Sequence, residues 1–65
     1  MMLSKYHVIG DYGPQGDQSI IRNYLASSPE NARLMFAERI KRESEYLWSR
    51  IGDRNISVYS GWWQH

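Results

Sequence analysis

A long amphipathic segment with helix start and stop signals constrains the fold of this chain most. Ser28, Pro29 and Glu30 form a typical start, because Ser caps free backbone N–H groups, Pro suits the first helical position, and Glu complements the positive end of the helix dipole. Gly52 is the residue type usually found just past a helix end. We therefore predict one helix over residues 29–51.

This segment carries an apolar stripe. Five apolar side chains recur at helical spacing and fall within an arc of about 100°; they are Ala32, Phe36, Ile40, Leu47 and Ile51. A stripe of this width is typical of a helix that covers a second layer.

The remaining segments favour strands. Residues 3–9 are rich in strand-forming side chains, residues 10–17 contain Gly and Pro as in a turn, and residues 56–60 alternate between apolar and polar. Residues 19–26 fit a helix or a strand, and we prefer a strand because about three strands are needed for a stable sheet. The sequence thus predicts an α+β fold, a three-stranded antiparallel sheet packed on one long helix (ββαβ), with βααβ as the alternative.

Size and composition limit the chain to one small domain over residues 1–65. A core of this size supplies roughly 3–5 kcal/mol of net stability, and without cysteine neither disulfides nor thiolate metal sites are available. No stretch resembles a membrane span or a signal peptide, so we expect a cytosolic protein. The three tryptophans and five tyrosines are more aromatic surface than so small a core easily hides. A larger partner or a second copy of the chain is expected to cover the excess.

The sequence offers no pattern typical of an enzyme, a metal site or a cofactor site. The two histidines, His7 and His65, lack metal-ligand spacing, and no nucleophile motif or phosphate-binding loop is present. Residues 10–17 are rich in Gly but have no Lys, and they do not lead directly into the long helix. We expect a protein without catalytic residues, metal or cofactor.

The candidate contact residues lie on two surfaces. The sheet face away from the helix is expected to carry Lys5, His7, Tyr59 and Trp63, beside Trp62, and we expect no other segment to cover it. Such a face could stack nucleic acid bases, but Lys5 is its only basic residue and the net charge is only +1. Contact with protein is therefore the preferred interpretation.

The other candidates lie on the helix. Trp48, at the border of the apolar stripe, fits an interface residue or a cap on the sheet edge. Glu43 projects inside the apolar arc, where it can pair with Arg39 or act as a specificity contact. Arg42 belongs to a mixed-charge outer face, which is a solvated surface or a polar recognition surface.

The run from Tyr24 to Ala32, Tyr-Leu-Ala-Ser-Ser-Pro-Glu-Asn-Ala, resembles the strand-to-helix junction of small ββαβ accessory proteins of phages and mobile elements, including some anti-CRISPR proteins. The resemblance implies a compact inhibitor that occupies a functional surface of a larger host protein or ribonucleoprotein complex. We expect such a protein-binding module, with a nucleic-acid-binding or transcription-accessory protein and a structural homo-oligomer as alternatives.

Overall fold

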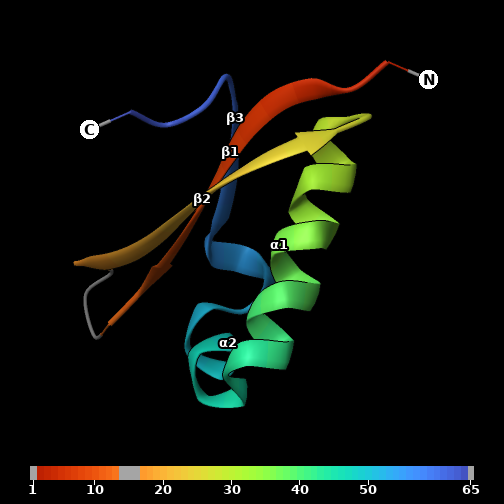
Figure 1. Ribbon diagram of the computed structural model, residues 1–65. Helices are drawn as coiled ribbons and strands as arrows, with labels where there is room; N and C mark the ends of the chain where they lie inside the picture. Colours follow the sequence, from red (N-terminus) through yellow and green to blue (C-terminus); the bar gives the residue numbers. More distant parts are fainter. Residues whose placement is uncertain (1, 14–16, 65) are drawn as a thin grey trace.

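The computed structural model describes residues 2–13 and 17–64. The elements follow in the order β1 (Ser4–Tyr12), β2 (Gln18–Ala26), α1 (Pro29–Glu43), α2 (Glu45–Ile51), a short 3₁₀ turn (Asp53–Asn55) and β3 (Ile56–Ser60). The two helices lie on one side of the sheet (Figure 1). The α+β layout with a three-stranded sheet is confirmed. His65 and residues 14–16, part of the predicted turn, lie outside the described residues.

The sheet is antiparallel and has the strand order β2-β1-β3. Tyr6 pairs with Tyr24 on one side and with Ser60 on the other, and Val8 pairs with Arg22 and Val58. Because side chains alternate along a strand, the partners of the buried Val8 face the helices, while the partners of His7 face the opposite side. We call this opposite side the open face.

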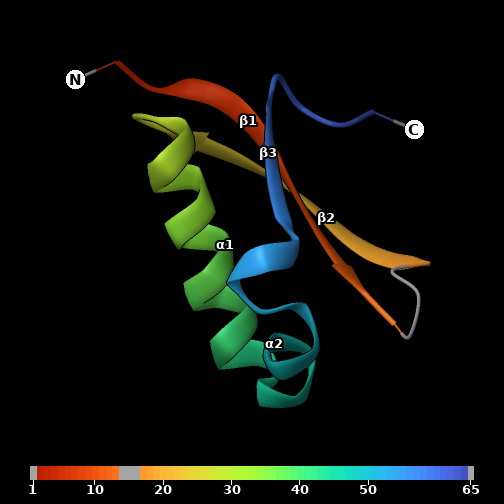
Figure 2. The same cartoon turned by 180° about the vertical axis from the view of Figure 1, so that it is seen from behind.

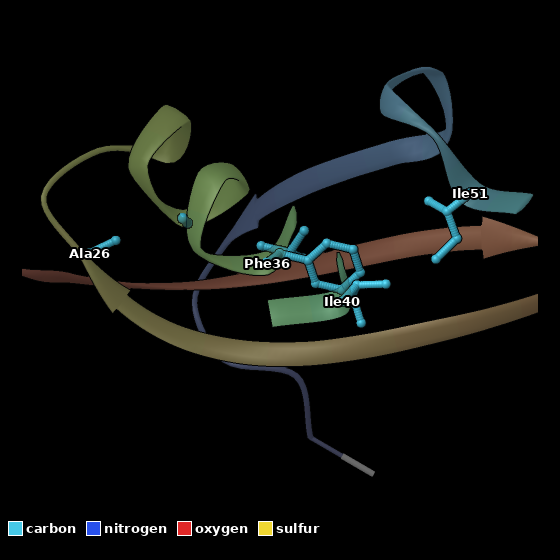
Figure 3. Close-up of a cluster of buried hydrophobic side chains, with 6 residues drawn as sticks. Ala26, Phe36, Ile40 and Ile51 are labelled. Atoms are coloured by element: carbon cyan, nitrogen blue, oxygen red, sulfur yellow. The ribbon is translucent and has the colours of Figure 1, made fainter. Parts of the chain in front are cut away.

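The core lies between the central strand and the helices. Phe36 and Ile40 from α1 and Ile51 from α2 are almost completely buried against Val8 of β1. Figure 3 shows the Phe36 ring lying over the sheet with Ile40 beside it, and Ile51 further along the strands. Four of the five predicted stripe residues are therefore buried in this core. The fifth, Leu47, is half-buried and packs against it.

The helical region differs from the single helix predicted over residues 29–51, because it is broken at Ser44. This residue has an extended backbone, ends α1 with a hydrogen bond from its N–H to the Ile40 carbonyl, and starts α2 by accepting one from the Leu47 N–H at 3.2 Å. The break redirects the chain so that Ile51 reaches the core beside β1. Ser44 followed by Glu45 is itself a helix start signal, masked in the sequence by the continuous apolar stripe.

The ambiguous segment 19–26 is a strand, and the βααβ alternative is wrong. Every residue of β2 has a partner on β1. The first strand runs to Tyr12 and so extends beyond the predicted residues 3–9. Gly10, which we predicted to begin a turn, lies inside this strand. β3 has the predicted bounds.

Candidate functional site

The open face is partly covered by the end of the chain. Gly61 follows β3 with a φ of +85°, a conformation that side-chain-bearing residues rarely adopt, and its N–H donates to the Lys5 carbonyl at 2.8 Å. The chain turns there, and residues 61–64, which we call the tail, lie on the side of the sheet opposite α1 (Figures 1 and 2). This corrects the expectation that no segment covers the open face.

Asn23 holds the tail to the far strand. Its side-chain oxygen accepts a hydrogen bond from the Trp63 N–H at 2.7 Å, and its side-chain nitrogen donates to the Trp63 carbonyl at 3.3 Å. The Trp62 indole N–H donates to the Tyr24 carbonyl at 3.2 Å. The tail therefore reaches from β3 across the central strand to β2.

His7 anchors the middle of the same arrangement. Its Nδ1 lies 2.9 Å from the Gly61 carbonyl oxygen, which can only accept, so this nitrogen carries the proton. The imidazole is stacked on the Tyr59 ring at a centroid distance of 5.2 Å and tilted against the Trp63 ring at 5.8 Å. The Lys5 ammonium lies 4.7 Å from the centre of the Trp62 ring, a cation–π distance.

Five of the eight predicted contact residues are thus brought together. We call this group the tail surface, and its members are Lys5, His7, Tyr59, Trp62 and Trp63. Despite the contacts that hold them, Tyr59, Trp62 and Trp63 remain 51%, 43% and 41% exposed. Aromatic rings that are fixed on one side and open on the other are typical of binding anchors.

Replacing Asn23 with Ala should loosen the tail without unfolding the domain. The substitution removes both hydrogen bonds to Trp63, each worth about 0.5–1.5 kcal/mol, while the contacts of Gly61 with β1 remain. We expect lower ¹H–¹⁵N heteronuclear NOE values for residues 61–64. Ser19→Ala, on the open face of the same strand, is the matched control and should leave them unchanged. Equal values in both variants would show that Asn23 does not hold the tail.

On the other face, Glu43 joins the edge strand to the helix. Its carboxylate accepts two hydrogen bonds from the Arg22 guanidinium, at 3.0 and 3.3 Å, and one from Arg39 Nε at 2.8 Å. The hydrogen bonds from Arg22, and to a lesser extent the one from Arg39, lower the pKa of the Glu43 carboxyl below its ordinary value. The expected pairing with Arg39 is confirmed, and Arg22 is a second partner that the sequence did not indicate.

The stabilising effect of Glu43 should depend on pH. A carboxyl group whose pKa is lowered by folding stabilises the protein above its unfolded pKa, about 4.3, and loses this contribution as the pH falls through the lower folded value. Glu43→Gln should therefore be less stable than the original chain at pH 7, with a difference that shrinks at acid pH. Urea unfolding at several pH values measures this. Glu38→Gln is the control, because Glu38 has no ion pair in the described residues. A difference that stays constant with pH would contradict the assignment.

The remaining helical candidates lie apart from the tail surface. Trp48 of α2 is half-buried, packs against the core and has the Lys41 ammonium 4.7 Å from its ring centre. Arg42 is exposed, lines an open groove between α1 and β2, and has no ion-pair partner among the residues described. A structural role therefore accounts for Trp48, whereas Arg42 keeps its charge available.

Within residues 2–13 and 17–64, no group of three or more His, Asp or Glu side chains is placed to hold a metal ion. No helix in the same part of the chain is long and apolar enough to cross a membrane. Comparison of the chain with protein families, curated proteins and solved structures found no match.

Proposed function

We propose that this chain is a non-enzymatic protein-binding module whose contact site is the tail surface. The observation that carries the proposal is the fixed but exposed position of Trp62 and Trp63, whose indoles lie on the open face and remain about two-fifths exposed. The small size, the order of two strands, a helical region and a third strand, and the strand-to-helix junction support a phage-type inhibitor of the anti-CRISPR kind. It would act in the cytosol by occupying a functional surface of a larger host complex.

The tail is already ordered by contacts with the sheet, which allows a few of its residues to bind a partner tightly. Binding costs free energy for each flexible side chain or segment that becomes ordered. Here the tail backbone both donates to and accepts from the Asn23 side chain, the Gly61 carbonyl accepts a hydrogen bond from His7 Nδ1, and the Trp63 ring contacts the His7 imidazole. Trp and Tyr anchors that are ordered before binding lose little entropy when a partner covers them.

The charge on the open face favours a protein partner over nucleic acid. Lys5 and Asp11 are the charged residues that β1 presents there, and their charges balance. The Lys5 ammonium is directed at the Trp62 ring. Nucleic acid binding depends on several basic groups that follow the phosphate backbone, and the described residues of this face do not include such a set.

The experiment is a pull-down from bacterial lysate with the tagged full chain, with and without nuclease, over a series of salt concentrations. A protein partner retained after nuclease treatment, with weak salt dependence, is the expected result. Retention that is lost with nuclease or falls steeply with salt would contradict the proposal and indicate nucleic acid binding. Recovery of the bait alone, with concentration-dependent light scattering, would instead indicate a homo-oligomer.

A further inference from the structure

The groove between α1 and the edge strand β2 has the features of a second contact site. It has a volume of about 450 Å³ and is open to solvent. On the strand side it is lined by Arg22 and Tyr24, and on the helix side by Met35, Glu38, Arg39 and Arg42. Asn23 also lines the groove, although its side chain lies on the open face. The groove therefore borders the outer edge of β2.

The outer edge of β2 is open in the part of the chain that the structure describes. The strand order β2-β1-β3 leaves β2 at the edge, with all nine of its residues paired to β1 on the inner side only. The Trp62 indole is the only group outside β1 that we find bonded to the described backbone of this strand. An edge of this length can pair with an added strand.

The charged side chains beside this edge determine which kind of strand can pair with it. Three guanidinium groups line the groove, and Glu43 engages those of Arg22 and Arg39. Arg42 has no ion-pair partner among the described residues, and Glu38 is the one acidic lining residue. A charged Arg on the helix-facing side of an edge strand opposes pairing with an apolar strand, but a carboxylate on the incoming strand would be attracted.

We propose that β2 and this groove bind an extended acidic segment of the protein partner, which adds to the sheet as a fourth strand. Alternate side chains of the segment then point toward the arginines, and a carboxylate among them pairs with Arg42. The other side chains point toward the tail surface, which Asn23 connects to β2. The inference rests on the proposed function, since it describes how the same partner is bound.

The test uses three nine-residue peptides, the length of β2, with blocked termini and alternating Thr and Val. They differ only in the central residue, which is Glu, Gln or Lys. They are titrated into the ¹⁵N-labelled full chain. We expect amide shifts in β2 and α1, slower hydrogen exchange in β2, and binding of the Glu peptide about fivefold tighter than the Gln peptide, with the Lys peptide weakest. Arg42→Glu should reverse this order. The matched control is Arg54→Glu, an exposed charge in the 3₁₀ turn, which should not.

Equal affinities for the three peptides, no binding at millimolar concentration, or shifts confined to other elements would overturn the proposed addition of an acidic strand. If the peptides do not bind while capture of a partner still depends on Trp62 and Trp63, strand addition is wrong but the proposed protein-binding function is kept. If the peptides bind as expected and the tail variants capture as much partner as the original chain, the groove is the contact site and the proposed tail surface is wrong.

Discussion

Phe36→Ala should leave about half or more of the protein unfolded at 25 °C. The Phe36 side chain is completely buried between α1 and the sheet and is among the largest of the buried side chains. Truncating a buried Phe to Ala costs about 3–5 kcal/mol, because apolar contacts are lost and a cavity remains. This equals the roughly 3–5 kcal/mol of net stability that a core of this size supplies.

Circular dichroism and urea unfolding measure this effect. Leu34→Ala is the matched control, since Leu34 lies on the same helix but is 62% exposed, and its truncation should change stability by no more than about 0.5 kcal/mol. A Phe36→Ala protein that unfolds cooperatively with less than about 1 kcal/mol of lost stability would show that the core is organised differently.

Gly10→Ala should destabilise the protein by about 1–3 kcal/mol through overpacking. A Cβ atom at this position would lie 2.8 Å from Cζ of Phe36 and 3.2 Å from Cδ1 of Ile51. Gly10 is not among the described glycines with positive φ, so the cost comes from this contact and not from its backbone conformation. Without the contact, Ala in place of Gly would favour folding slightly.

The same contact can be tested by rescue. Leu at position 36 is shorter than Phe, so Phe36→Leu should be less harmful in the presence of Gly10→Ala than alone. We expect a coupling of about 0.5–3 kcal/mol in the double-mutant cycle measured by urea unfolding. Additive effects, or a Gly10→Ala protein more stable than the original, would show that the ring does not contact Gly10.

The elements were largely predictable because local signals specify them. The Ser28 cap, the helical stripe and the alternation after Asn55 each depend on neighbouring residues, and all three correspond to observed elements. Gly10 was misread as a turn residue because its function is to admit the Phe36 ring, a contact between segments far apart in the sequence. The helix break had a local signal at Ser44, but the apolar stripe continued across it.

The candidate site was only partly predictable. Alternation along the first and last strands placed Lys5, His7 and Tyr59 on one face, and the structure brings them together. The return of the tail depends on Asn23 bonding to Trp63, forty residues later. The groove depends likewise on Arg22 meeting Glu43 across the layers. Neither pair is related by spacing along the chain.

The most direct test of the central claim compares partner capture by three tagged baits in one nuclease-treated lysate: the original chain, a Trp62→Ala/Trp63→Ala variant, and Tyr46→Ala. Tyr46 is an exposed aromatic residue on α2, away from the tail surface. Circular dichroism of each bait is the control for folding. Loss of two anchor residues should weaken capture at least about thirtyfold, while Tyr46→Ala captures as much as the original chain. Equal capture by a folded Trp62→Ala/Trp63→Ala variant would show that the tail surface is not the binding site.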